Sequence, residues 1–408
     1  MIVFVNRYFH PDQSATSRML SDLVFRLARR GVSVAVVTSR QLYNDPRANL
    51  PANELIQSVA IHRVATATRG RARLSGRALD YASFYVTAGA KLLQILSRGD
   101  VVVAKTDPPL VSIPVSMAAS YKGAVLVNWL QDLFPEVAAA LTPGLIPGWL
   151  HKVLLAVRDR SLRQAGMNIV LGDVMCKRLL MRGIDGSRIL TIPNWSDAES
   201  IVPQPSQNSV TRRALGLAGK FVVGYSGNFG RAHEFETLVG AAQLLRAEPQ
   251  FAFLMTGTGA KSSSLQEAVR SRGLQNFVFQ DYQPPEMLGD SLAASDVHLV
   301  SLLPPLEGLI VPSKIYGILA AGRPAVFVGD SQGELANLLR EHECGITVPV
   351  NDCEGLARQL RALRADHPRL QALGARARQL AVDRFSGEQA AAEWLSFLAP
   401  YGVKQAQQ

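Results

Sequence analysis

The sequence predicts an α/β protein built from two doubly wound, parallel-sheet domains. Short apolar runs rich in Val and Ile alternate with helix-like stretches, stop at a polar Pro- and Ser-bearing segment (196–208), and then start again. Such alternation favours parallel sheets with crossover helices. A chain of 408 residues is also long for one domain. We therefore expect an N-terminal domain over residues 1–197 and a C-terminal domain over residues 198–385.

Six apolar runs are the expected strands of the first domain. They cover residues 2–5, 32–38, 100–105, 123–129, 167–171 and 189–192. Residues 17–30 carry Leu20, Leu23 and Leu27 at helical spacing, which predicts a helix after the first strand. Gly31 is expected to end that helix, because glycine adopts the left-handed conformation found there.

The second domain repeats the pattern after the linker. Its expected strands cover residues 221–225, 251–256, 276–280, 297–301, 325–328 and 345–348. A last helix is expected at 387–398, where Trp394 and Phe397 lie among alanines. Because parallel strands point their carboxyl ends the same way, ligands are expected at that edge of each sheet.

Composition argues against a membrane-spanning or secreted protein. No apolar run approaches the 18 residues that a spanning helix needs. Residues 1–5 are followed at once by polar residues, so they are interpreted as a first strand and not as a signal peptide. Cys176, Cys344 and Cys353 show no metal-like spacing and no even pairing, which favours the cytoplasm.

The net charge of +10 is concentrated in the first half of the chain. Residues 1–197 hold 24 basic and 13 acidic residues, whereas the remainder holds 19 and 20. The first domain is therefore expected to meet an anionic partner. The basic residues form two groups, Arg69, Arg71, Arg73 and Arg77, and Lys152, Arg158, Arg160 and Arg163.

The second basic group lies beside Trp149 and Leu150, a mixture typical of a helix in a membrane interface. We expect the N-terminal domain to dock on an anionic membrane surface. The alternative is an ordinary domain helix with a solvated basic face. Nucleic acid is disfavoured, because no aromatic-studded strand or nucleic-acid motif accompanies the charge.

Residues 311–326 hold the most informative motif. Lys314 starts an apolar helix-like run that ends at Gly322, and Pro324 leads into the strand-like run 325–328. A loop that feeds a helix N-terminus suits an anion, and a lysine adds a point charge for phosphate. The alternative is a helix–strand unit with a chance surface lysine.

A second motif, residues 221–238, predicts a buried strand, a turn with Gly227 and Gly230, and a helix. Glycines at such a turn let the backbone approach a bulky anion closely. Arg231 and His233 lie beside the turn. The alternative is an ordinary strand-to-helix turn, and the spacing is not the G-x-G-x-x-G pattern of a dinucleotide site.

Together these motifs resemble the family-four (group 1) retaining glycosyltransferases of the GT-B fold. The resemblance is closest to the branch that makes bacterial surface polysaccharides, including fucosamine-type transferases. It spans the whole chain and is carried by His10-Pro-Asp-Gln-Ser-Ala-Thr16, Trp129-Leu-Gln-Asp-Leu-Phe-Pro-Glu136, Tyr225-Ser-Gly-Asn-Phe-Gly-Arg-Ala-His233 and Pro312-Ser-Lys-Ile-Tyr-Gly-Ile-Leu-Ala-Ala-Gly-Arg-Pro324.

The resemblance implies two Rossmann-like domains that face a central cleft. The first (1–197) would bind the acceptor and the second (198–385) the nucleotide sugar, while residues 386–408 would cross back to the first domain. It implies diphosphate contacts from Arg231 and Lys314, with Gly227, Asn228 and Ser313 around them. No metal or cofactor is expected, because the nucleotide sugar is a substrate and no Asp-x-Asp pair occurs.

The sequence departs from the family at two places. His233 stands where many relatives have a second phosphate-binding lysine. The Glu-x7-Glu pair of the family falls on Leu309 and Gly317, so neither carboxylate is present. We expect Glu307, with backbone amides of the loop that holds Gly308, Leu309 and Ile310, to face the sugar instead.

The remaining site residues follow other strands. Asp132 resembles a family residue near the reacting carbon of the donor sugar, where a carboxylate accepts a hydroxyl hydrogen bond or steadies positive charge; the alternative is a helix N-cap. Asp281 and Tyr282 are expected to border the base, and Asp107 to face the acceptor. Asp12 lies where relatives place a loop under the phosphates.

The sequence thus predicts a retaining transferase that moves a sugar from a nucleotide diphosphate sugar, expected to be a UDP-sugar, by front-face displacement. A polyprenyl-diphosphate-linked sugar at the cytoplasmic membrane face is the expected acceptor, although a soluble glycan stays open. The alternatives are a nucleotide-sugar 2-epimerase of the same fold and a non-catalytic partner subunit. Oligomeric state is not predicted.

Overall fold

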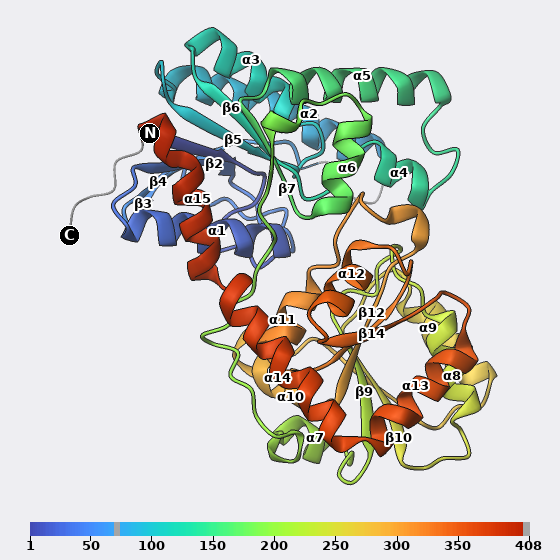
Figure 1. The fold of residues 1–408 in the computed structure, drawn as a ribbon. Helices are drawn as coiled ribbons and strands as arrows, with labels where there is room; N and C mark the ends of the chain where they lie inside the picture. The colour runs from blue at the N-terminus through green and yellow to red at the C-terminus, as the bar shows by residue number, and fades with distance from the viewer. Residues whose placement is uncertain (69–73, 403–408) are drawn as a thin grey trace. The chain divides into compact units, whose positions relative to one another are not determined.

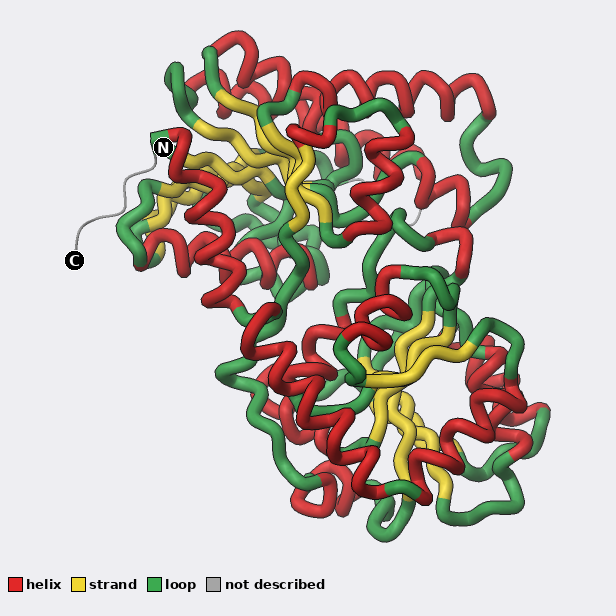
Figure 2. Tube along the Cα trace, in the orientation of Figure 1, coloured by secondary structure: helices red, strands yellow, loops and turns green. Residues whose placement is uncertain are grey.

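The computed structural model describes residues 1–68 and 74–402, and it divides into two compact α/β units (Figure 1). The first comprises Met1–Pro193 and the C-terminal segment from Gly387, and the second is Asn194–Ser386. In each unit, helices flank a central sheet (Figure 2). Arg69, Arg71 and Arg73 of the first basic group lie outside the described residues.

The first unit holds an eight-stranded sheet in the order β3-β4-β2-β1-β5-β6-β7-β8. All neighbours are parallel except β3 and β4. The strands are β1 (Ile2–Val5), β2 (Val34–Ser39), β3 (Asn53–Ile56), β4 (Val59–Val64), β5 (Val101–Lys105), β6 (Val125–Trp129), β7 (Met167–Val170) and β8 (Ile189–Thr191). Strands β3 and β4 were not predicted from the sequence.

Seven α-helices of the described chain belong to the first unit. They are α1 (Ala15–Arg29), α2 (Leu74–Ile95), α3 (Ser112–Lys122), α4 (Glu136–Leu141), α5 (Gly148–Gln164), α6 (Asp173–Met181) and α15 (Gly387–Leu398). Gly31 has φ of 78°, so it ends α1 in the left-handed conformation as expected. None of the helices in the described ranges is long and apolar enough to span a membrane.

The last helix, α15, belongs to the core of the first unit. Trp394 is fully buried, with its ring 5.0 Å from that of Trp129 and 5.7 Å from that of Phe4. Glu388 pairs with Arg26 of α1 at the start of the helix. The chain therefore leaves the first unit, builds the second, and returns to complete the first.

The second unit holds a six-stranded, all-parallel sheet in the order β11-β10-β9-β12-β13-β14. Its strands are β9 (Phe221–Ser226), β10 (Phe251–Thr256), β11 (Phe277–Gln280), β12 (Val297–Ser301), β13 (Ala325–Val328) and β14 (Gly345–Val348). Its helices are α7 (Val210–Ala214), α8 (Glu236–Leu244), α9 (Ser262–Ser271), α10 (Leu288–Ala293), α11 (Lys314–Ala320), α12 (Glu334–Glu341), α13 (Cys353–Ala365) and α14 (His367–Arg384).

Each sheet has one point at which the strand order reverses. It lies between β1 and β5 in the first unit and between β9 and β12 in the second. The loops that follow such a pair diverge to opposite faces of the sheet and leave a crevice at the carboxyl ends of the strands. These two points therefore set where ligand-binding side chains can gather in each unit.

Candidate active site

The reversal point of the second unit brings the two sequence motifs together. Gly227 directly follows β9 with φ of 132°, and Gly257 directly follows β10 with φ of 124°. A Cβ on Gly257 would collide with the carbonyl oxygen of Gly227. Both positions therefore need glycine, and the two loops pack backbone to backbone at the edge of the sheet.

Lys314 lies against this glycine turn. It is the first residue of α11, and its Nζ lies 3.5 Å from the centroid of the Tyr225 ring. A Cβ added to Gly227 would lie 3.6 Å from that Nζ. The amine is screened from solvent, and no protein group of the described residues accepts a hydrogen bond from it. Burial holds the pKa of Lys314 well below its ordinary value.

His233 lies beside Lys314 as a neutral imidazole. Its Nδ1 lies 2.7 Å from the carbonyl oxygen of Ser301. Because a carbonyl can only accept, Nδ1 carries the hydrogen and Nε2 presents a lone pair. Burial first, and then the Lys314 charge, lower the pKa of His233 to about 3. In this state His233 cannot donate to a phosphate through Nε2, unlike the lysine of many relatives.

Lys261 is a basic residue of this cluster that the sequence analysis missed. It closes the loop after β10, and its Nζ donates to the backbone oxygen of His233 at 2.6 Å. The sequence does contain an indication of this residue, because strand 251–256 is followed by Gly257-Thr-Gly259 and, two residues later, by Lys261. A second glycine-rich strand-to-helix turn beside the first would have indicated it.

The other residues predicted around the diphosphate are more exposed. Arg231 and Asn228 lie on the outer side of the loop after β9, and Ser313 precedes α11 without capping it through its side chain. The backbone oxygen of Asn228 accepts a hydrogen bond from the Tyr225 hydroxyl at 2.9 Å. Because α11 has only seven residues, its dipole adds little here, and the basic side chains are the main candidates for contact with an anion.

Glu307 does not face this cluster. It is 5% exposed, and its carboxylate accepts a hydrogen bond from the backbone N–H of Glu334, at the start of α12. The amides of Leu309 and Ile310 both donate to the backbone oxygen of Leu306. Gly308, at φ of 69°, lies in the turn between Leu306 and Leu309. In this structure the carboxylate and these amides form hydrogen bonds within the protein, and their contact with the sugar stays a prediction.

Asp281 and Tyr282 follow the edge strand β11, and both are exposed. A Cβ on Gly257 would lie 3.4 Å from Tyr282, so the Tyr282 ring borders the packed glycine loops. Tyr282 therefore lines the same edge as Lys314, at its outer rim.

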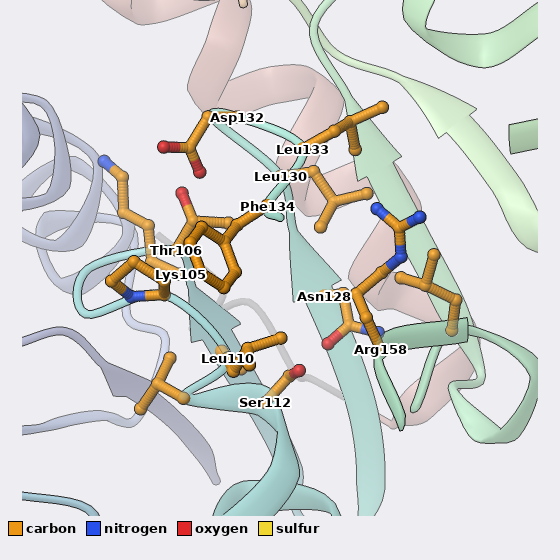
Figure 3. Close-up of a pocket in the computed structure, with 14 residues that line it drawn as sticks. Lys105, Thr106, Leu110, Ser112, Asn128, Leu130, Asp132, Leu133, Phe134 and Arg158 are labelled. Carbon is orange, nitrogen blue, oxygen red and sulfur yellow. The ribbon is translucent and has the colours of Figure 1, made fainter. Parts of the chain in front are cut away.

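In the first unit, Asp132 lines a pocket at the carboxyl ends of β5 and β6 (Figure 3). A hydrogen bond from the Thr106 hydroxyl reaches its carboxylate, yet burial raises the pKa of Asp132 to about 6. Helix α4 is preceded by Pro135 and has no side-chain cap, so Asp132 is not its N-cap. The alternative role that the sequence left open for Asp132 is therefore excluded.

Lys105 is a buried amine in the same pocket, and the sequence analysis did not single it out. It is 1% exposed, donates to the backbone oxygen of Thr16 at 3.0 Å and lies 4.0 Å from the Trp129 ring centroid. Burial lowers the pKa of Lys105 to about 7, and the nearby Asp107 carboxylate offsets part of that shift. Asp12 is also buried, and it ties its loop to the backbone N–H of Ser14.

Comparisons with known proteins agree with this arrangement. A glycosyl transferase 4-like domain matches residues 14–195, and the model described as glycosyl transferases group 1 matches residues 220–366. The two matches together span most of the chain, one in each unit. The chain belongs to the group 1 glycosyltransferases. It is an enzyme of that class, as the resemblance implied.

Relatives are found over much of the chain. It is 29% identical over 275 residues to a probable glycosyltransferase WbjE of Pseudomonas aeruginosa, covering 66% of this chain and 67% of the relative. It is 26% identical over 344 residues to a putative colanic acid biosynthesis glycosyl transferase WcaI of Escherichia coli, covering 81% and 83%.

The solved structure of Anabaena HepE, in complex with UDP and glucose, has the same fold. The TM-score is 0.74 with 16% identity, covering 98% of this chain and 99% of HepE. At this identity the similarity establishes architecture, and it confirms the GT-B fold predicted from the sequence.

Proposed function

We propose that this group 1 glycosyltransferase transfers a sugar from a nucleotide diphosphate sugar, most specifically a UDP-sugar, to a lipid-linked glycan of a cell-surface polysaccharide. The observation that carries the proposal is the Lys314 amine, which lies against Gly227 at the reversal point of the second sheet with no protein acceptor among the described residues. The UDP bound to HepE supports the donor class, and the name of WcaI, which assigns that relative to colanic acid biosynthesis, supports a role in polysaccharide synthesis.

Sugar transfer requires the second unit to stabilise the negative charge that builds on the departing diphosphate. Lys314 and Arg231, with the backbone around Gly227, supply that stabilisation, so the proposal requires no metal ion. Retention follows if the acceptor oxygen attacks from the face that the diphosphate leaves, while a phosphate oxygen of the donor takes the hydroxyl proton of the acceptor. One C–O bond forms, one breaks, and the nucleoside diphosphate carries the proton away.

Asp132 of the first unit is proposed to act on the donor sugar. Its carboxylate has one buried oxygen without a protein partner in the described part of the chain. Above a pH of about 6 it is charged, and it can then accept a sugar hydroxyl hydrogen bond or steady the positive charge of the sugar ring.

We also propose that the enzyme is cytoplasmic and lies on the inner membrane face. Helix α5 exposes Trp149, Lys152, Val153 and Arg160 along one side, mixing aromatic, aliphatic and cationic groups. Neighbouring α3 exposes Met117 and Tyr121. Such a surface suits the boundary between anionic headgroups and acyl chains. Arg158 is not part of it, because it is buried and paired with Glu136 and Asp159.

The test combines nucleotide binding with transfer. Thermal stabilisation by UDP, GDP, dTDP and ADP, in EDTA, identifies the donor class. Lys314→Ala is expected to lose stabilisation by the preferred nucleotide and to lower transfer by about 10²–10³-fold. Asp132→Asn is expected to keep nucleotide binding while transfer falls.

Lys177→Ala serves as the matched control, since Lys177 is an exposed lysine of α6. Nucleotide binding that never leads to transfer to lipid-linked acceptors would favour the non-catalytic partner subunit. If Lys314→Ala transferred sugar at the wild-type rate, the assignment of the donor site to the cluster around Lys314 would be wrong.

A further inference from the structure

Within residues 1–68 and 74–402, no carboxylate forms an ion pair with Lys314, His233 or Lys261. Tyr225 of β9 lies under the Lys314 amine, His233 approaches from the loop after β9, and Lys261 approaches from the loop after β10 through its bond to His233. Tyr282 borders the glycine loops beside Tyr225. Burial is the sole cause of the lowered pKa of Lys314, and no carboxylate is among the groups that shift the pKa of His233.

The contacts of Lys314 fit a neutral amine better than an ammonium ion. An ammonium ion that loses water needs hydrogen-bond acceptors for its three N–H groups, and a ring face replaces only part of that. Lys105 in the first unit shows the contrast, because it has both a ring and the Thr16 carbonyl oxygen. For Lys314 the described residues offer the ring of Tyr225 alone.

Among Lys314, His233 and Lys261, only the Lys314 amine is expected to change its protonation state when an anion binds. His233 already donates its Nδ1 hydrogen to Ser301, and the Lys261 amine is held by the backbone oxygen of His233. Protonation of His233 would place a positive charge beside the Lys314 and Lys261 amines, and no carboxylate is among the groups that shift its pKa. The group free to take up charge when an anion enters is therefore Lys314, whose four-carbon stem lets the amine leave the ring face.

We propose that the donor site takes up one proton together with its diphosphate. In the free protein Lys314 rests on Tyr225 as an uncharged amine, and in the complex it is an ammonium ion on the phosphate oxygens. The amine lone pair takes a proton from the buffer acid, and no other bond is made or broken. This inference rests on the proposed function, because it assigns the diphosphate to the second unit.

Proton uptake makes nucleotide affinity depend on pH. An anion in contact with an amine raises the pKa of that amine. Between the pKa of free Lys314 and that of the bound state, affinity falls about tenfold for each unit by which the pH rises. Release of the nucleotide product should accelerate over the same range.

The decisive experiment is calorimetric titration with UDP at pH 8, in Hepes and in Tris, whose protons leave with different enthalpies. At this pH the terminal phosphate of UDP is already ionised, since its last pKa is about 6. The difference in heat gives the number of protons taken up. We expect between one half and one for the wild-type protein.

Two variants test which residue takes up the proton. Lys314→Arg keeps a permanent charge and should bind UDP with uptake near zero. His233→Asn can still donate to Ser301, does not titrate, and should keep the uptake of the wild-type protein. Uptake lost in His233→Asn but kept in Lys314→Arg would overturn the assignment to Lys314.

A second measurement needs no variant. The affinity of the wild-type protein for UDP should fall as the pH rises between the pKa of free Lys314 and that of the complex, by about tenfold per unit. Binding of UDP with no proton uptake and no pH dependence would overturn this inference and leave the proposed function intact. Failure of UDP, GDP, dTDP and ADP all to bind would overturn both.

Discussion

Lys105 and Lys314 are both amines buried at the carboxyl ends of strands, yet their contacts assign them different tasks. Lys105 donates to the Thr16 carbonyl oxygen and so holds the first turn of α1 against β5. Lys314 has no such bond within the described residues. A buried amine with a protein partner fits an architectural role, whereas one without a partner fits an incoming ligand.

The burial of Lys105 predicts a pH-dependent stability. Its pKa is about 7 in the folded protein and about 10.4 when unfolded. Between these values the unfolded chain binds the extra proton, so stability rises with pH there, by at most about 1.4 kcal/mol per unit. Below about pH 7 both states are protonated and the full cost of the buried charge applies.

Lys105→Met should therefore stabilise the first unit by about 1–4 kcal/mol at pH 6, and the gain should shrink toward pH 10. Urea unfolding of both proteins at pH 6, 8 and 9.5 measures this, with exposed Lys177→Met as the control. A loss of stability that stays constant with pH would instead mark Lys105 as a required cation.

The two motifs were sufficient to single out Gly227, His233 and Lys314, because the glycine turn follows a recognisable strand and Lys314 starts a recognisable helix, whereas Lys261 was missed. The contacts of Lys105 and Glu307 could not be predicted from the sequence. Lys105 meets Thr16, 89 positions away, and Glu307 meets the start of α12, 27 positions away. Sequence spacing carries no signal for contacts that only the folded chain makes.

At the scale of elements, the hairpin β3–β4 was missed for a local reason. Its turn residues, Gln57 and Ser58, have φ of 48° and 65°. Two-residue turns of this kind normally carry Asn-Gly or Asp-Gly, which tolerate positive φ. Without glycine the turn gives no signal, and the charged residues in both strands obscure the apolar alternation. The other strands are mostly apolar, so their positions were predicted to within two residues.

Helix α5 carries the prediction of membrane docking. Changing Lys152 and Arg160 together to glutamine should weaken binding to anionic vesicles by about 10–30-fold, at about 1 kcal/mol for each cation. Trp149→Ala should weaken it further by removing an interfacial anchor. Vesicle sedimentation at low ionic strength measures both effects.

The matched control removes the same charge from the second unit, with Arg358→Gln and Arg369→Gln, both exposed. If these two changes weaken vesicle binding as much as the α5 pair, net charge and not the α5 surface governs attachment. Vesicles of zwitterionic lipid should show little dependence on either pair.

At the scale of the whole molecule, the first unit is built from two distant pieces of chain. Residues up to Pro193 form its sheet, and α15 supplies Trp394 to the core only after the second unit has been made. The region 386–408 was expected from the family resemblance to cross back. Arg26 fixes the point of return, since it pairs with Glu388 and lies so close to Gly387 that a Cβ there would meet its guanidinium.

This arrangement predicts that the stability of the first unit depends on its last helix. Trp394→Ala removes a fully buried ring that packs on Trp129 and Phe4, so it should cost about 3–5 kcal/mol. Trp149→Ala, at a site 70% exposed, should change stability by less than about 0.5 kcal/mol. Urea unfolding read by hydrogen exchange should place the Trp394→Ala loss in strands β1, β5 and β6 and leave β9 and β12 protected. An equal loss of protection in both units would mean that the two do not unfold independently.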